Sequence, residues 1–245
     1  MTERDIRVFD DSAALATQAA IEFQTRSHAA VRDHGRFAVA LSGGKTPKAM
    51  FELLCSTDFE EDIPWESVHV FWGDERCVPP HDPRSNYGMT QAVLLDRVPI
   101  PAANVHRMEG EDEPHAAAVK YSEELERFFA GPAKFDLTYL GLGPDGHTAS
   151  LFPHTGALSV TDKQCVANCA DEKIDPPWRL TLTYPALNAS QSVIFLVGGR
   201  DKTEIVAKVL EGPRDPQLLP AQGIEPAGVL IWLLDRAASA KLHSL

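Results

Sequence analysis

The sequence has few cysteines and no apolar run long enough to cross a bilayer. Four cysteines in 245 residues are too few for a disulfide framework. Cys165 and Cys169 have no second ligand pair nearby, so we expect no metal site. The first residues lack the apolar core of a signal peptide, and we therefore expect a cytoplasmic protein with no membrane partner.

The sequence also lacks a basic stripe. Its formal net charge is −12 at pH 7, which argues against binding to nucleic acid or to an anionic membrane. An anionic substrate must therefore be held by local positive groups and not by the field of the whole molecule. The composition leaves open a monomer or a small homo-oligomer.

What the sequence has is an alternation of apolar runs with helical patterns. The runs that predict strands lie at 37–41, 68–72, 135–140, 164–169, 179–184, 192–197 and 229–234. The patterns that predict helices lie at 13–31, 47–55, 85–95, 113–129 and 201–210. This order predicts a single α/β domain over residues 1–245, with a Rossmann-like, doubly wound, mostly parallel sheet and helices on both faces. The region 165–184 breaks the alternation, and we expect antiparallel strands there.

The loop after the strand at 37–41 suits a phosphate group. Gly43 and Gly44 allow a sharp turn and a close approach of a ligand to the backbone amides. These amides and the dipole of the following helix attract anions. The polar side chains that the loop adds are Ser42, Lys45 and Thr46.

The same loop has the start signals of a helix. Thr46 is predicted to be the N-cap, with Pro47 as the first helical residue. Gly44-Lys45-Thr46 also resembles part of a nucleotide-binding P-loop, but that motif requires a glycine where Val39 stands. A phosphate ester on a small molecule therefore fits better than ATP. A plain turn between strand and helix is the alternative.

A second glycine-rich loop follows the strand at 135–140. It places Asp145 and His147 after Gly141 and Gly143. Ligands of open α/β sheets bind at the carboxyl ends of the strands. A histidine there can exchange a proton near neutral pH, which makes His147 a candidate for acid–base chemistry. The alternative is an ordinary surface turn.

Charged residues stand next to three further strands. Asp74, Glu75 and Arg76 follow one strand, Arg179 begins another, and Lys202 follows a third. A guanidinium group can bind a phosphate or a carboxylate with two hydrogen bonds. The recurrence of basic residues beside turns predicts a phosphate clamp, and the alternative for each one is a solvated surface charge.

Taken together, these motifs resemble the 6-phosphogluconolactonases. The segments that carry the resemblance are Ser42-Gly-Gly-Lys-Thr-Pro47, Trp72-Gly-Asp-Glu-Arg76, Ser85-Asn86, Gly141-Leu-Gly-Pro-Asp-Gly-His-Thr-Ala-Ser-Leu-Phe-Pro153 and Arg179-Leu-Thr181. The resemblance implies a NagB/RpiA-like fold. It also implies hydrolysis of 6-phospho-D-glucono-1,5-lactone to 6-phosphogluconate in the oxidative pentose phosphate pathway, with no metal or organic cofactor.

The resemblance also implies roles for single residues. His147 corresponds to the general base of the family. The positions that match its ligand-binding residues are Ser42, Gly43, Gly44, Thr46, Arg76, Arg179 and Lys202. Lys45 departs from the family, which often has serine there. Whether Lys45 or Glu75 contacts substrate is left open, and the segment 171–177 is either a flap over the site or a passive connection.

Lactone chemistry suggests how these residues act. Neutral His147 would take a proton from water and return one to the ring oxygen that leaves. Arg76 or a loop amide would face the developing oxyanion. Either Asp145 or Asp74 would hold the imidazole in the required tautomer, and the sequence does not choose between them.

Two rival functions can be compared with this hypothesis. The sugar-phosphate deaminases on the same fold have a glutamate five residues after the histidine, where this chain has Phe152. Asp74 is shared by both groups and does not discriminate. A sugar-phosphate sensor without turnover would carry a helix-turn-helix DNA-binding domain, for which we find no residues before the first helix. The lactonase is therefore the favoured hypothesis.

Overall fold

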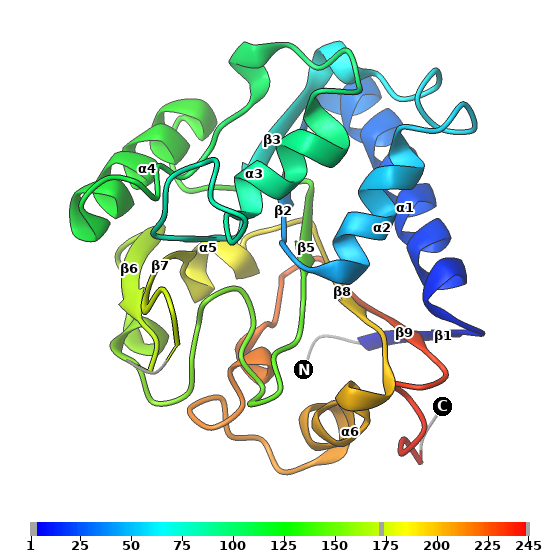
Figure 1. Cartoon of the computed structure of the whole chain (residues 1–245), viewed down its shortest axis with the longest axis vertical. Coiled ribbons are helices and arrows are strands. Elements are labelled where there is room, and N and C mark those ends of the chain that lie inside the picture. The colour runs from blue at the N-terminus through cyan, green and yellow to red at the C-terminus, as the bar shows by residue number, and fades with distance from the viewer. Residues whose placement is uncertain (1–3, 172–173, 244–245) are drawn as a thin grey trace.

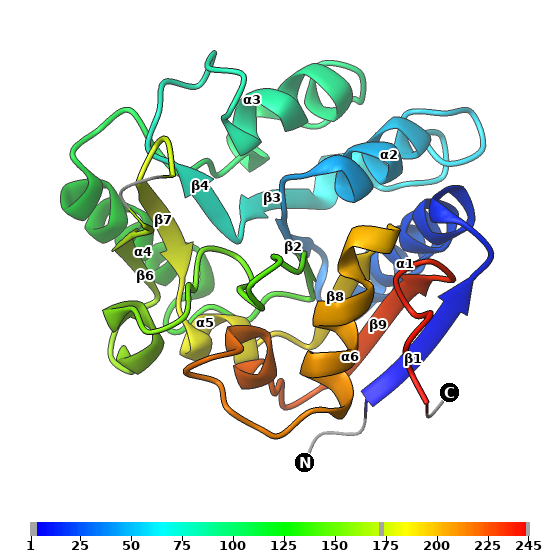
Figure 2. The ribbon, with the colours of Figure 1, turned by 60° about the horizontal axis from the view of Figure 1, so that its bottom comes forward.

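The computed structural model describes residues 4–171 and 174–243. Six strands of this part form one sheet in which every neighbouring pair is parallel, in the order β1-β9-β8-β5-β2-β3. Figures 1 and 2 show these strands across the middle of the molecule. The strands are β1 (Arg4–Phe9), β2 (Phe37–Leu41), β3 (Val68–Trp72), β5 (Leu137–Leu140), β8 (Ser192–Val197) and β9 (Val229–Asp235).

A smaller antiparallel sheet continues from the edge strand β3. Its order is β4-β7-β6, with β4 at Asp74–Arg76, β6 at Cys165–Cys169 and β7 at Trp178–Leu182. Gly73 joins the two sheets, because its N–H donates to the carbonyl of Leu41 and its own carbonyl accepts from the N–H of Leu182. The antiparallel strands predicted for this region are confirmed.

Helices cover both faces of the large sheet. The α-helices are α1 (Ser12–His34), α2 (Lys45–Leu54), α3 (Asn86–Thr90), α4 (Pro114–Phe129), α5 (Tyr184–Asn188) and α6 (Thr203–Glu211). A π-helical turn at Gln91–Leu95 continues α3, and 3-10 turns lie at Trp65–Ser67, Ala102–Asn104, Gly156–Ser159, Arg200–Lys202 and Pro220–Gly223. None of the helices in these described ranges combines the length and apolar composition that a bilayer span requires.

The alternation of side chains along the strands builds a core on each face. In β2, Val39 and Leu41 pack with α1 and α2, whereas Ala38 and Ala40 face the cluster that contains residues of α4 and α6. Strands buried on both faces are read from the sequence as continuous apolar runs, which explains why these strands could be predicted. The doubly wound fold with helices on both faces is confirmed, and Figure 1 shows α1 and α2 on one side with α4 on the other.

Some details of the prediction are wrong. The helix α2 begins at Lys45, not at Pro47, and its N-cap is Gly44, so Thr46 does not cap it. Gly44 has φ of 112°, a conformation that favours glycine, and this turns the chain into the helix earlier than a threonine cap would. Strand β1 was also missed, because Arg4, Asp5 and Arg7 interrupt its apolar pattern at an edge position.

The strand order brings the two glycine loops together. Strands β2 and β5 are neighbours, and the loops that follow them begin at Ser42 and Gly141. The chain leaves β2 through α2 on one face, and after β5 it continues to the small sheet on the other face. A crevice opens where consecutive connections leave on opposite faces, and this is the usual ligand site of doubly wound sheets.

Candidate active site

A pocket of about 370 Å³ occupies this crevice. Eight of the predicted site residues line it, namely Ser42, Gly43, Gly44, Asp74, Arg76, His147, Arg179 and Lys202. They come from the ends of β2, β3, β5 and β8 and from the small sheet. The carboxyl ends of the parallel strands thus bring together residues that are as distant in the sequence as Ser42 and Lys202.

His147 is held in the pocket wall by the loop after β5. Its ring lies against Gly143, where an added Cβ would stand 2.1 Å from two ring atoms of the histidine. Phe152 also packs against the imidazole, with the two ring centroids 4.7 Å apart. The side chain of His147 is 26% exposed, so it is packed on its sides and still open to the pocket.

Asp145 sets the orientation of this imidazole. Its Oδ1 lies 2.5 Å from Nδ1 of His147 and 3.2 Å from the backbone nitrogen of the same residue. Burial raises the pKa of Asp145, but the hydrogen bond and charge of His147 outweigh this and keep the pKa below its usual value. An ionised Asp145 accepts a hydrogen bond from Nδ1–H of His147, which leaves Nε2 as the nitrogen that can accept a proton.

Asp74 lines the same pocket but is bonded elsewhere. Its Oδ2 accepts a hydrogen bond of 2.6 Å from the hydroxyl of Ser150, and its Oδ1 accepts one of 3.3 Å from the amide of Asn86. Of the two carboxylates left open by the sequence, the structure therefore pairs Asp145 with the imidazole of His147. Asp74 instead presents a buried carboxylate to the pocket, with a side chain that is held in place.

Two arginines form a positive wall. Arg76 and Arg179 are register partners on β4 and β7, and their guanidinium groups donate to the backbone carbonyls of Arg84 and Pro176. Burial, followed by the charge of Arg76, lowers the pKa of Arg179 from its usual value. The Nε of Arg76 is buried without a hydrogen-bond partner among the described residues. Two adjacent cations with a free donor favour an anion as the missing partner.

The loop after β2 supplies backbone donors opposite this wall. No side chain caps the first amides of α2, which leaves them able to bind an anion at the positive end of the helix. Gly43 allows Asn86 to approach, because a Cβ there would stand 1.8 Å from the side-chain oxygen of Asn86. Lys202, half-buried just before α6, adds a third cation.

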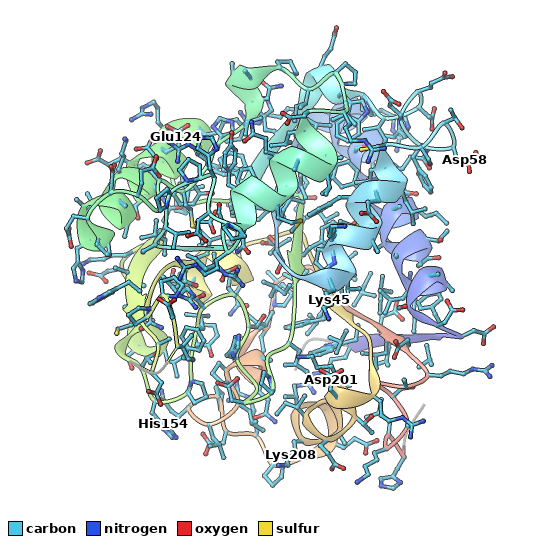
Figure 3. The ribbon with its side chains drawn as sticks, viewed as in Figure 1. Lys45, Asp58, Glu124, His154, Asp201 and Lys208 are labelled. Carbon is cyan, nitrogen blue, oxygen red and sulfur yellow. The ribbon has the colours of Figure 1, made fainter. Side chains whose placement is uncertain are left out.

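Lys45 and Thr46 are not among the residues that line the pocket. Lys45 is the exposed first residue of α2, and Figure 3 labels it at that end of the helix. Their predicted contact with a ligand stays a prediction. In the segment 171–177, residues 172 and 173 lie outside the described residues, whereas Ile174 lines the pocket.

The sequence left open whether Glu75 contacts substrate, and in the structure its side chain is a buried hydrogen-bond acceptor. It is 2% exposed and accepts hydrogen bonds from the backbone N–H groups of Arg76, Asn86 and Tyr87 and from the hydroxyl of Ser85. Burial raises its pKa, against the lowering effect of the three backbone donors. Glu75 therefore holds the start of α3, and with it Asn86, against the pocket.

Sequence reasoning gave no role to three polar residues that line the pocket, Asn86, Thr148 and Ser150. Asn86 donates 2.9 Å to the carbonyl of Asp74, and Thr148 donates 2.8 Å to the carbonyl of Gly141. The only signal in the sequence was their presence within the motifs that carry the family resemblance. Their contacts depend on which loops meet, so they could not be derived from spacing.

The fold and the pocket define an α/β enzyme that handles small anionic substrates at the switch point of a doubly wound sheet. The chain belongs to the family of glucosamine-6-phosphate isomerases and 6-phosphogluconolactonases, whose pattern matches residues 10–232.

Relatives of this chain agree with that membership. A 6-phosphogluconolactonase of Nostoc sp. is 42% identical over 245 residues, covering 98% of this chain and 99% of that protein. Another, of Synechocystis sp., is 43% identical over 234 residues, covering 94% of each. The crystal structure of a 6-phosphogluconolactonase from Thermotoga maritima has a TM-score of 0.82 at 30% identity, covering 95% of this chain and all of that one.

Proposed function

We propose that this protein hydrolyses 6-phospho-D-glucono-1,5-lactone to 6-phospho-D-gluconate in the oxidative pentose phosphate pathway. The observation that carries the proposal is the Asp145–His147 pair, which opens onto a pocket lined by three cations. Relatives of that name, 42% and 43% identical to this chain, support it.

His147 is the general base of the proposed mechanism. Its Nε2 takes a proton from a water molecule, whose oxygen attacks the lactone carbonyl carbon. The imidazolium that forms is stabilised by the carboxylate of Asp145, 2.5 Å from Nδ1. The tetrahedral intermediate collapses as the ring oxygen leaves with the proton from Nε2, and the new acid group loses its proton to solvent. A positioned base of this kind contributes about 10²–10⁴-fold to the rate.

The cations have two tasks in this mechanism. Arg179, Lys202 and the loop Ser42–Gly44 bind the phosphate at one end of the substrate, which fixes the carbonyl near His147. Arg76, with its unpaired Nε, stabilises the charge that develops on the carbonyl oxygen. Asp74 accepts hydrogen bonds from sugar hydroxyl groups, since its carboxylate faces the same pocket. None of these steps requires a metal or an organic cofactor.

The residue next to the imidazole argues against the deaminase. Phe152 packs on His147 with ring centroids 4.7 Å apart, at the position where the deaminases have their glutamate. A phenyl ring cannot exchange a proton, so ring opening of an amino sugar would lack its catalyst. A binding protein without turnover would have no need for the Asp145–His147 pair.

The direct test is lactone consumption with freshly generated 6-phosphogluconolactone, corrected for spontaneous hydrolysis. We expect clear acceleration that EDTA does not abolish, and no ammonia release from glucosamine 6-phosphate. Ammonia release without lactone hydrolysis would support the deaminase, and tight binding of 6-phosphogluconate without turnover would support the sensor.

We also propose that the chain folds as a single domain and that the protein resides in the cytoplasm. One apolar cluster combines Ala38 and Phe71 of the large sheet with Leu180 and Leu182 of the small sheet, so the small sheet shares its core with the large one. The four cysteines are free thiols, which suits a reducing compartment.

A further inference from the structure

Arg84 lies outside the pocket but is hydrogen-bonded to Arg76, which lines it, and to Asp175, which follows the lining residue Ile174. Its carbonyl oxygen accepts a hydrogen bond of 2.5 Å from Nη1 of Arg76. Its guanidinium is fixed by Asp82, with Nε 2.8 Å from Oδ1 and Nη2 2.7 Å from Oδ2. This two-point contact holds the pKa of Asp82 well below its usual value. The remaining donor, Nη1, is thereby directed away from Asp82.

That donor reaches the segment that precedes β7. Nη1 of Arg84 lies 2.6 Å from Oδ2 of Asp175. The next residue, Pro176, accepts a hydrogen bond from the guanidinium of Arg179, and the preceding residue, Ile174, lines the catalytic pocket. The ion pair between Arg84 and Asp175 therefore connects the loop before α3 to the carbonyl that orients Arg179.

We infer that Arg84 is a positioning residue for substrate capture, an inference that rests on the proposed function. Through Asp175 it fixes the carbonyl of Pro176, and this carbonyl aims the guanidinium of Arg179 at the substrate phosphate. Because Arg179 binds the phosphate equally in the ground state and the transition state, loss of this alignment changes KM more than kcat.

The expected size of the change in KM follows from the solvent exposure of the ion pair between Arg84 and Asp175. The side chains of Arg84 and Asp175 are 40% and 86% exposed, so water and salt screen their attraction. Exposed ion pairs of this kind shift equilibria by about five-fold at most. We therefore expect a KM increase of about two- to five-fold for Arg84→Ala, with kcat and the melting temperature nearly unchanged.

The test is a double-mutant cycle with Arg84→Ala and Asp175→Asn, measured as kcat and KM for the lactone at low and high salt. We expect each single variant to raise KM and the double variant to match the single ones, because both remove the same link. Arg84→Lys keeps a positive charge near Asp175 and is expected to have an intermediate KM. The matched control is Arg127→Ala, which breaks an exposed pair with Glu124 on α4 at 2.8 Å and should leave KM unchanged.

Two results would overturn the inference. The first is multiplication of the single effects in the double variant, which would mean that the two residues act separately. The second is an unchanged KM in Arg84→Ala, or a loss of kcat and melting temperature without a change in KM. If the unaltered protein does not hydrolyse the lactone, the proposed function fails, and the cycle is then measured as the affinity for 6-phosphogluconate by calorimetry.

Discussion

The imidazole of His147 can pair with Asp145 because Gly143, which lies against its ring, has no side chain. Gly143 gives the imidazole its place, since any Cβ there would overlap the ring. Gly146, with φ of 82°, returns the chain so that Asp145 and His147 can meet on the same side of the loop. The glycines of this loop therefore serve the geometry of the pair, and the chemistry belongs to Asp145 and His147 themselves.

A substitution of His147 tests this pair directly. His147→Ala is expected to lower kcat by about 10²–10⁴-fold, because water then lacks its base, with only a small change in the affinity for 6-phosphogluconate. Asp145→Asn is the companion variant, because an amide can accept the Nδ1–H bond but cannot stabilise the imidazolium to the same extent. Steady-state kinetics with calorimetry separates the two quantities. Near-normal turnover of His147→Ala would rule out its role as the base.

At the scale of elements, the start of α3 depends on a carboxylate from a neighbouring strand. Glu75 on β4 accepts from the first amides of α3 and thereby places Asn86 beside Gly43. The helix has five residues and would be too short to form alone. The strand thus supplies the charge that the helix end requires.

Glu75→Gln is expected to destabilise the protein. In either orientation the new amide group faces a backbone N–H that loses its acceptor, and one buried unpaired donor costs about 1–3 kcal/mol. Urea unfolding of this variant should show a loss of that order together with a higher KM, since Asn86 loses its support. The control is Glu123→Gln on the exposed side of α4, which should be neutral. Equal stability of the two variants would contradict this account.

At the scale of the whole molecule, the edge of the large sheet contains a histidine that links stability to pH. His69 on β3 lies 3.2 Å from Nε2 of His106, whose other nitrogen contacts Glu124 at 2.8 Å. Burial, then the charges of His106 and Arg36, lower the pKa of His69 from 6.5 to about 4. Between these two values the unfolded chain binds a proton that the folded chain does not bind.

This linkage predicts the sign of a pH effect. The stabilisation is fully present above the unfolded value of 6.5 and is lost as the pH falls toward about 4. His69→Gln should flatten the dependence of the unfolding free energy on pH within this window, as measured by urea denaturation at several pH values. His81→Gln, at an exposed histidine, should keep the slope of the unaltered protein. Identical slopes for the two variants would refute the assignment.

Some helices and strands could be predicted from the sequence and others could not, and the difference has physical reasons. The strands at Phe37–Leu41 and Val68–Trp72 were predicted to the residue, because strands buried on both faces are uniformly apolar and end at turn residues. Strand β1 was missed because an edge strand needs little apolar surface and carries charge. The start of α2 was placed at Pro47 because proline is favoured at the first position of a helix, whereas the conformation of Gly44 begins the helix at Lys45.

The sequence by itself determined which residues stand at the ends of the buried strands, since burial and turn chemistry are local properties. His147, Ser42 and Arg179 could therefore be named as candidates before any distance was known. Only the tertiary structure decided that Asp145 pairs with His147, that Glu75 caps α3 and that Arg84 reaches Asp175. Asp145 and His147 are close in the sequence, but their pairing depends on how the loop around Gly143 and Gly146 folds. Arg84 and Asp175 lie on loops that are distant along the chain, and the strand order and side-chain packing bring them together. Spacing in the sequence encodes neither result.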